Sequence, residues 1–247
     1  MNKFEGKVVV ITGGNSGIGY ATTREFIKEG AHVIITGKRR DALDKAARET
    51  GATAILADQA SLQDIERLVQ ELKTLYGKVD VLFINAGVAF FAPIEHITED
   101  QFDAMTDINF KGSFFTLQKF IPLLNDGASV VFLTSNNTAM TMPGSSVYAA
   151  GKSAIGHIAR IAAKELAPRK IRVNTVNPGP TQTEMINKFG FDEATLKSMT
   201  ESILAQVPLA KLGKADDVAK MVTYLADNNT SSFITGAEFF IDGGLAV

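Results

Sequence analysis

Short runs of β-branched and other apolar residues alternate along this chain with segments whose apolar residues recur at helical spacing. The first run covers residues 7–12, and the periodic segment 18–29 follows it and stops at Gly30. Continuous apolar runs are typical of buried strands, and a stripe at intervals of three and four is typical of amphipathic helices. A glycine directly after the periodic residues marks a helix end. The chain is therefore predicted to begin with a strand, a tight turn and a helix.

The same alternation continues towards the C-terminus. Further strands are expected over 31–36, 52–57, 79–84, 129–134, 171–176 and 238–241. Helices are expected over 41–50, 62–76, 102–124, 147–167 and 216–227. Alternating strands and helices form right-handed βαβ units, in which a parallel sheet is covered on both faces. We expect an α/β fold with a doubly wound parallel sheet of about seven strands, forming a single domain over residues 1–247.

The pattern breaks between Pro178 and Lys214, where short helical pieces follow a cluster of proline and glycine. A long irregular insertion in a regular sheet is usually a binding lid or a disordered segment. We expect a substrate lid around residues 180–214.

Charge and composition exclude several classes of function. The 25 basic and 27 acidic residues are spread along the chain and leave a net charge of -2, which argues against the basic stripe of a nucleic-acid binder. The chain has no cysteine, and its three histidines do not form a metal-ligand spacing. Neither a signal peptide nor an apolar run of ~18 residues is present. We expect a soluble, cytoplasmic protein with no metal, no nucleic acid and no membrane partner.

A glycine-rich loop separates the first strand from the first helix. Its spacing, Gly-x-x-x-Gly-x-Gly, differs from the usual dinucleotide fingerprint Gly-x-Gly-x-x-Gly, but its place between strand and helix is the same. Glycines there let the backbone approach a pyrophosphate, and the helix N-terminus offers N–H groups and a positive dipole end. The alternative is a glycine-rich turn without a ligand. The residues expected to contact the cofactor are Gly13, Asn15, Ser16, Gly17, Ile18 and Gly19.

The end of the second strand carries cations instead of an acid. An acidic residue there accepts hydrogen bonds from a ribose 2′-hydroxyl, whereas this chain has Gly37, Lys38, Arg39 and Arg40. We therefore expect NADP(H) to be preferred, with NAD(H) possible. The alternative is that these cations only begin the next helix in solvent.

Tyr148 and Lys152 are four residues apart on a predicted helix, which places both side chains on one face. A nearby cation stabilises a phenolate, so we expect the Tyr148 pKa to be depressed. Ser135 follows the predicted strand 129–134 and could meet this pair in space. A Tyr-x-x-x-Lys pair alone also occurs by chance as a solvated pair.

Together these features resemble the short-chain dehydrogenase/reductase family, and the likeness runs from about residue 7 to residue 244. The matching pieces, in chain order, are TGGNSGIG at 12–19, Asp58, NAG at 85–87, Asn109, Ser135, YAAGK at 148–152, NPG at 177–179, Thr183, TG at 235–236 and DGG at 242–244. Three positions depart from the common pattern: Gln59, Ile84 and Gly151.

The resemblance implies a Rossmann-type fold and a set of catalytic roles. Tyr148 would be the general acid or base, Ser135 would bind the substrate oxygen, and Lys152 would hold the nicotinamide ribose. Asn109 would keep the water chain that returns the proton. Asp58 would bind adenine, Asn85, Ala86 and Gly87 would line the adenosine ribose, and Thr183 would hold the carboxamide. The remaining cofactor residues are Pro178, Gly179 and Thr181.

The predicted function is an NADP(H)-dependent oxidoreductase that transfers hydride between nicotinamide and a carbonyl or secondary alcohol. An NAD-linked alcohol dehydrogenase and a non-catalytic NADP(H)-binding regulator are the alternatives. The family also implies a homotetramer formed through the two long helices. A mostly apolar pocket for a hydrophobic ketone or oxo compound is expected from Phe90, Phe91, Asn137, Met140, Met142, Met185 and Phe189.

Overall fold

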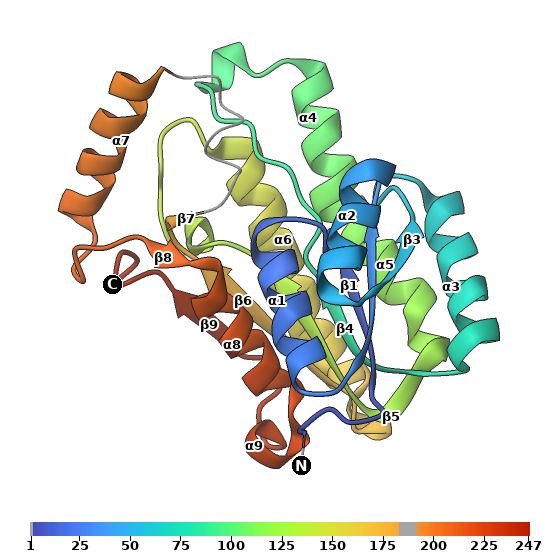
Figure 1. Cartoon of the computed structure of the whole chain (residues 1–247). Helices are drawn as coiled ribbons and strands as arrows, with labels where there is room; N and C mark the ends of the chain where they lie inside the picture. Colours follow the sequence, from blue (N-terminus) through green and yellow to red (C-terminus); the bar gives the residue numbers. More distant parts are fainter. Residues whose placement is uncertain (1, 183–191) are drawn as a thin grey trace.

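The computed structural model describes residues 2–182 and 192–247, and its centre is a parallel sheet (Figure 1). The sheet has seven strands in the order β3-β2-β1-β4-β5-β6-β9, and every neighbouring pair is parallel. The strands are β1 (Val8–Thr12), β2 (His32–Gly37), β3 (Thr53–Leu56), β4 (Val79–Ile84), β5 (Leu124–Leu133), β6 (Arg172–Pro178) and β9 (Glu238–Ile241). This arrangement confirms the expected doubly wound α/β fold.

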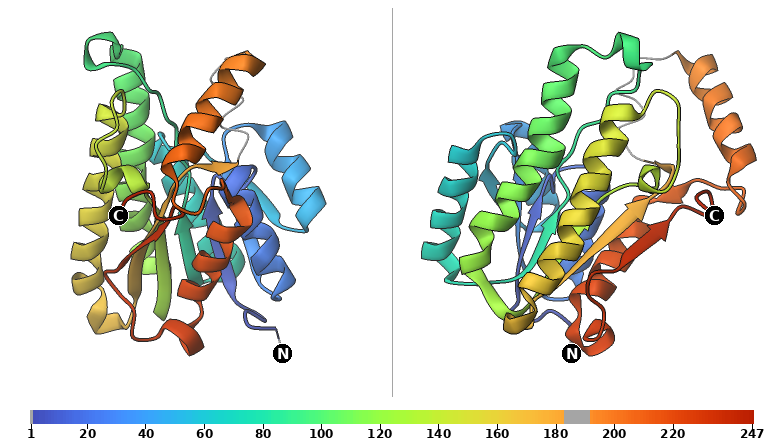
Figure 2. Two further views of the ribbon diagram at one scale, coloured as in Figure 1. Left: turned by 90° about the vertical axis from the view of Figure 1, so that its left-hand side faces the viewer. Right: turned by 180° about the vertical axis from the view of Figure 1, so that it is seen from behind.

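Helices cover both faces of the sheet (Figure 2). They are α1 (Gly17–Lys28), α2 (Arg40–Thr50), α3 (Leu62–Tyr76), α4 (Glu99–Met105), α5 (Ser113–Phe120), α6 (Ser146–Glu165), α7 (Glu193–Gln206), α8 (Ala215–Ala226) and α9 (Asn228–Ser231). Short 3-10 helices are η1 (Ile94–His96), η3 (Ile121–Leu123), η4 (Asn136–Thr138) and η5 (Ala167–Arg169).

Two separate cores hold these layers together. Successive side chains of a strand point to opposite faces, and in β1 Val10 joins one core while Val9 and Ile11 join the other. The first core lies under α3, α5 and α6, and the second lies under α1, α2 and α8. Because both faces are buried, the strands carry the continuous apolar runs from which they were predicted.

Strand β1 pairs with both β2 and β4, so the chain reverses its direction of travel across the sheet at this point. Ligands of doubly wound folds bind in the crevice at the carboxyl ends of the strands on either side of such a switch point. The glycine loop follows β1 and residues 85–87 follow β4, so both lie at this crevice.

The single helix predicted over 102–124 is wrong in detail. The structure has α4, then a π-helix η2 (Thr106–Gly112), then α5, and Leu124 already belongs to β5. A Cβ at Gly112 would lie 2.1 Å from the carbonyl oxygen of Gln59, so the wide turn packs directly on the loop after β3. The apolar stripe continues through this turn, which is why periodicity did not reveal it.

The expected lid around 180–214 includes residues 183–191, which lie outside the described part of the chain, so the lid stays a prediction. Thr183, Met185 and Phe189 lie in that gap. On either side of it, β7 (Thr181–Gln182) and β8 (Gly213–Lys214) form a small two-stranded parallel sheet that was not predicted. Among the described residues no helix is long and apolar enough to cross a membrane.

Candidate active site

The glycine loop after β1 has a backbone that requires glycine. Gly13 and Gly17 have φ angles of 65° and 54°, in the left-handed region that side chains with a Cβ rarely adopt. A Cβ on Gly19 would lie 2.3 Å from the carbonyl oxygen of Gly13, so the first turn of α1 packs against the loop. Ser16 precedes α1 without capping it through its side chain, which leaves the first-turn N–H groups without a side-chain acceptor.

Thr12 and Asn85 tie the glycine loop to the end of β4. The Thr12 Oγ1 accepts hydrogen bonds from the backbone N–H groups of Asn85 and Ala86, each at 3.0 Å. The Asn85 Nδ2 donates to the carbonyl oxygens of Thr12 and Gly13 at 2.8 and 3.1 Å. The Asn85 side chain therefore stabilises the conformation of the glycine loop and holds it against the end of β4.

The end of β2 is followed by three exposed cations, Lys38, Arg39 and Arg40. Arg40 lies 3.7 Å from Asp44 of its own helix, whereas Lys38 and Arg39 form no ion pair with any described residue. A Cβ on Gly37 would lie 2.7 Å from the Asn15 Oδ1, so Asn15 of the glycine loop reaches over the end of β2. The cations and the glycine loop are thus adjacent.

The loop after β3 holds Asp58 by its backbone and by its carboxylate. The Asp58 N–H donates to Asp64 at 2.9 Å, which lowers the pKa of Asp64, and the Asp58 Oδ1 accepts from the Ala60 N–H at 3.0 Å. The unusual Gln59 is buried and its Nε2 donates to Thr116 of α5 at 3.0 Å. A polar residue is accommodated at this position because its amide finds a partner.

Ser135, Tyr148 and Lys152 meet at the carboxyl end of β5. Ser135 begins the turn η4 and is hydrogen-bonded to the Tyr148 hydroxyl. The Lys152 Nζ lies 5.9 Å from the centre of the Tyr148 ring and donates to the Leu133 carbonyl at 2.7 Å. The expected meeting of the serine with the Tyr/Lys pair is therefore found in the structure.

Burial shifts both titratable groups towards their neutral forms. It raises the pKa of Tyr148 above its ordinary value of 10.0, and the hydrogen bond from Ser135 acts in the opposite direction but is the smaller effect. It lowers the pKa of Lys152 to about 8. The expected depression of the Tyr148 pKa is wrong for the chain alone, because desolvation by burial raises this pKa more than the Ser135 hydrogen bond lowers it.

Asn109 projects from the π-helix towards the loop after β4. Its carboxamide forms two hydrogen bonds with the backbone of Val88, at 2.9 Å from the N–H and 2.8 Å to the carbonyl. A Cβ on Gly87 would lie 3.0 Å from the Asn109 Oδ1 and 3.5 Å from the Lys152 Nζ. Asn109, Gly87 and Lys152 thus lie close together at the end of β4.

The segment after β6 continues the rim of the crevice. The Gly179 N–H donates to the Ile241 carbonyl at 3.1 Å, and the Thr181 Oγ1 donates to the Gly179 carbonyl at 3.0 Å. A Cβ on Gly179 would lie 2.5 Å from the Asp242 Cβ, so only glycine allows this approach. Pro178 is buried at the end of β6. Among the described residues there is no cluster of side chains that could hold a metal ion.

Comparison with known proteins agrees with this geometry. The sequence model of a family described as enoyl-(acyl carrier protein) reductase matches residues 13–246. The 3-oxoacyl-[acyl-carrier-protein] reductase FabG of Thermotoga maritima is 35% identical, over 99% of this chain and 100% of its own length. The chain belongs to the short-chain dehydrogenase/reductase family.

Two other members of the family carry different names. The NADP-dependent (R)-specific alcohol dehydrogenase of Lentilactobacillus kefiri is 31% identical, over 98% of each chain. The cyclic-di-GMP-binding biofilm dispersal mediator protein of Escherichia coli is 34% identical, also over 98% of each. Relatives of similar sequence identity to this chain therefore carry names that describe different activities.

Solved structures of the family superpose closely. BdcA in complex with NADPH has a TM-score of 0.88 at 32% identity, over 98% of this chain and 95% of its own. The 3-ketoacyl-(acyl-carrier-protein) reductase of Brucella melitensis, complexed with NADH, has a TM-score of 0.90 at 29% identity, over 98% and 99%. This chain therefore has the family fold over nearly its whole length, and these two relatives bind a nicotinamide cofactor.

The Phe91 ring, one of the residues expected to line a substrate pocket, lies 5.6 Å from the Tyr148 ring in an edge contact. Phe90 and Met142 are exposed, and Asn137 is buried. Met140 accepts a hydrogen bond from Asn136. Of the expected pocket residues that the structure describes, Phe91 is therefore the one found in contact with the tyrosine.

Sequence reasoning missed a group of polar residues behind Ser135. The sequence pattern marks Asn177 only as part of the NPG motif and gives no role to Thr134, Thr138 or Glu238. In the structure the Asn177 carboxamide is hydrogen-bonded to all three. A threonine three residues after Ser135 was the available signal, because such a hydroxyl often bonds a nearby carbonyl.

Proposed function

We propose that this chain is an NADP(H)-dependent oxidoreductase that transfers hydride between nicotinamide and a carbonyl or secondary alcohol, with Tyr148 as general acid and base. The observation that carries the proposal is the contact of Ser135 with Tyr148 beside Lys152, at the crevice bordered by the glycine loop. The cofactor, when bound, supplies or accepts the hydride, and the protein supplies the proton and the oxygen-binding groups.

Tyr148 is suited to donate a proton during carbonyl reduction. Because burial raises its pKa, the phenol stays protonated at neutral pH and can transfer its proton to the substrate oxygen. Ser135 hydrogen-bonds the same oxygen and stabilises the negative charge that develops on it. In alcohol oxidation the same phenol, once deprotonated, accepts the proton.

Lys152 and Asn109 support this chemistry. The Lys152 ammonium has three N–H donors and uses one on Leu133, so two remain for the nicotinamide ribose hydroxyls. Asn109 is fixed by its hydrogen bonds to the Val88 backbone. It would border the space beside Lys152 through which a water chain returns the proton. The two bonds to Val88 use one donor and one acceptor site of the Asn109 carboxamide, so one of each remains for water beside Lys152.

The residues of the crevice fit a dinucleotide. The glycine loop and the first turn of α1 would bind the pyrophosphate, and Asp58 the adenine. Lys38 and Arg39 have the charge and freedom to bind a 2′-phosphate, which supports NADP(H) over NAD(H). The NADPH complex of BdcA supports this choice, although the Brucella structure contains NADH.

The substrate is proposed to be a hydrophobic ketone or oxo compound. Phe91 packs against Tyr148, and Phe90 and Met142 are exposed on the segments expected to border the site. Apolar side chains lining a site favour an apolar ligand. Asn137, two residues after Ser135, is buried and carries the one polar side chain of the expected pocket.

The first experiment is Tyr148→Phe, with Tyr76→Phe as the matched control because the Tyr76 hydroxyl lies 3.4 Å from Thr53, away from the site. NADPH consumption with a panel of carbonyl compounds should fall by orders of magnitude in Tyr148→Phe only, while NADPH binding is retained. Undiminished turnover in Tyr148→Phe would refute the mechanism.

A second candidate is a nucleotide-binding regulator without catalysis, favoured by the name of the Escherichia coli relative. It predicts tight NADPH binding, no turnover with any carbonyl of the panel, and no effect of Tyr148→Phe. The complete Ser135, Tyr148 and Lys152 cluster has no purpose in such a protein, which is why the enzyme is preferred.

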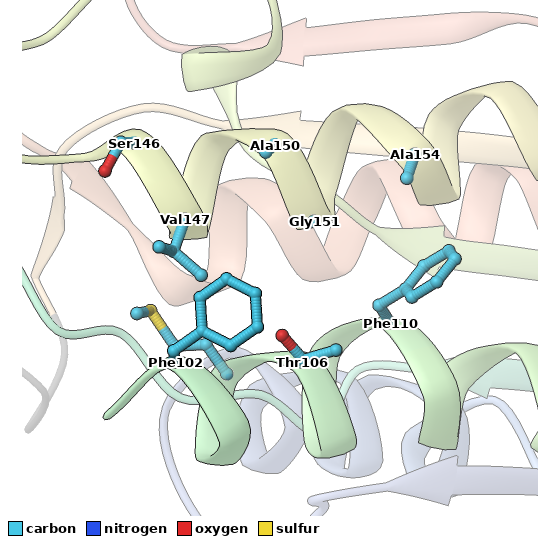
Figure 3. Close-up of a pocket in the computed structure, with 9 residues that line it drawn as sticks. Phe102, Thr106, Phe110, Ser146, Val147, Ala150, Gly151 and Ala154 are labelled. Carbon is cyan, nitrogen blue, oxygen red and sulfur yellow. The ribbon is translucent and has the colours of Figure 1, made fainter. Parts of the chain in front are cut away.

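We also propose that the chain forms a homo-oligomer through α4, η2 and α6. A cavity of about 370 Å³ lies between these helices and does not include Ser135, Tyr148 or Lys152 (Figure 3). Phe102 and Phe110 border it on one side, and the small residues Ala150, Gly151 and Ala154 border it on the other. An apolar groove beside small residues suits the close approach of a second copy.

A further inference from the structure

The carboxamide of Asn177, at the end of β6, is completely buried and uses all of its hydrogen-bonding capacity. Its Oδ1 accepts from the hydroxyls of Thr134 at 2.6 Å and Thr175 at 2.9 Å. Its Nδ2 donates to the Thr138 Oγ1 at 3.0 Å and to the Glu238 Oε2 at 3.1 Å. An amide has two donors and two acceptor sites, so no capacity is left over.

The direction of each hydrogen bond follows from this count. The Asn177 Nδ2 can only donate, so the Thr138 hydroxyl accepts from it and has its own hydrogen free for another acceptor. That acceptor is the carbonyl oxygen of Ser135, 2.9 Å away. Asn177 is therefore hydrogen-bonded to Thr134, directly before Ser135, and to Thr138, which in turn bonds the Ser135 carbonyl.

Glu238 prevents the carboxamide from turning over. A carboxylate only accepts hydrogen bonds, so it holds the Nδ2 end of Asn177 towards β9. Its other oxygen is paired with Arg160, which lies on α6 two turns after Lys152. The network thus joins the turn that bears Ser135 to the helix that bears Tyr148, through the ends of β6 and β9.

We propose that Asn177 and Thr138 are positioning residues that set the Ser135 hydroxyl against the Tyr148 phenol. Neither contacts the reacting groups. They act by holding the backbone of residues 134–138, and the proposal rests on the proposed function for its kinetic consequences only. The arrangement itself can be tested without turnover, because Ser135 lowers the Tyr148 pKa through their hydrogen bond.

The decisive variant is Thr138→Val, which keeps the shape of the side chain and removes the hydroxyl link. Thr138→Ser restores the hydroxyl and should restore the wild-type behaviour. Thr223→Val is the matched control, because Thr223 is equally half-buried and its Oγ1 also donates to the carbonyl three residues earlier at 2.9 Å, but on α8. These three variants separate positioning from general destabilisation.

Two measurements are made on each full-length variant. The first is the ¹³Cζ NMR signal of the tyrosines, of which the chain has four, with Tyr148 assigned by its loss in Tyr148→Phe. The second is the kinetics of NADPH-dependent carbonyl reduction. In Thr138→Val we expect the Tyr148 signal to move and kcat to fall on the order of tenfold, with KM for NADPH unchanged, since small misplacements of reacting groups are costly.

Asn177→Asp gives a second arm if Thr138→Val has a small effect. Aspartate has the same shape but cannot donate to Thr138, and it places a second carboxylate beside Glu238. Asn174→Asp is its control, because Asn174 is equally buried on β6 but bonds Ile234 and Ala237 instead. The Tyr148 signal should shift in Asn177→Asp and not in Asn174→Asp.

The two proposals fail in different ways. If the Tyr148 signal is the same in Thr138→Val and Asn177→Asp as in the wild type, the positioning role is refuted whatever the activity. If the wild type reduces no carbonyl with NADPH, the proposed function is refuted, and the NMR shift still decides the positioning role. Equal shifts in Thr138→Val and Thr138→Ser would also refute it, because the hydroxyl would then be irrelevant.

Discussion

Removing the two free cations after β2 tests the cofactor preference most directly. Lys38 and Arg39 are exposed and form no ion pair with any described residue, whereas Arg40 is 3.7 Å from Asp44. If they bind a 2′-phosphate, Lys38→Ala and Arg39→Ala should weaken NADPH binding and leave NADH binding unchanged. Arg40→Ala removes the same charge from the same segment and is the control.

The expected size follows from the exposure of these groups. Two unit charges about 4 Å apart interact by about 1 kcal/mol in water and about 4 kcal/mol at the effective dielectric near a protein surface. Exposed pairs are screened by salt, so the lower figure applies. Since about 1.4 kcal/mol is tenfold in affinity, each substitution should weaken NADPH binding about fivefold and the double substitution about 30-fold.

The assay is a fluorescence titration of each variant with NADPH and with NADH, at low and at moderate salt. Added salt should weaken NADPH binding in the wild type and have a much smaller effect in the double variant. Two results would refute the reasoning: NADPH affinity within twofold of wild type in the Lys38→Ala/Arg39→Ala variant, or an equal loss of NADH affinity.

Three further predictions address the loop, the lysine and the groove. Gly19→Ala should abolish cofactor binding, because its Cβ would lie 2.3 Å from a carbonyl oxygen of the same loop. Gly151→Ala, with nothing within 4 Å of its Cβ, should keep cofactor binding and raise the free energy of unfolding by up to ~1 kcal/mol through helix propensity. Equal cofactor affinity in the two variants would contradict this. Burial lowers the pKa of Lys152 from 10.5 to about 8, so between these pH values the unfolded chain binds more protons and stability rises with pH. Relative to Lys152→Met, the wild type should gain up to about 3 kcal/mol of unfolding free energy across that window, measured by denaturant titration; parallel pH curves would exclude it. Phe110→Asp should dissociate the proposed oligomer in light scattering while Leu75→Asp on α3 does not, and a wild-type monomer would end that proposal.

The alternation of apolar runs and amphipathic stripes was enough to predict the sheet, because both faces of a parallel sheet are buried. The bounds of α3 and β4 agree with the prediction at both ends. The same logic failed over 102–124, since a π-turn such as η2 leaves the apolar stripe continuous. Within η2, Gly112 packs against the backbone of Gln59, a contact between distant segments that no local pattern contains.

The candidate site was predictable where one residue type is required by backbone geometry or spacing. Gly13 and Gly17 adopt positive φ, and the Tyr148 and Lys152 pair shares a helix face. Asn177 was not predictable as a positioning group, because its partners come from β5, η4, β6 and β9 and meet only in the folded sheet. A fully satisfied buried amide leaves no signal of its role in the sequence around it.

The error about the Tyr148 pKa has a consequence for the direction of reaction. Spacing showed a cation beside a phenol, but burial acts on both, and it opposes the charged form of each. At neutral pH the chain alone therefore holds Tyr148 as a protonated acid, the form that carbonyl reduction needs. Alcohol oxidation needs the phenolate, so it should require either a higher pH or additional positive charge at the site, such as an oxidised nicotinamide ring would supply.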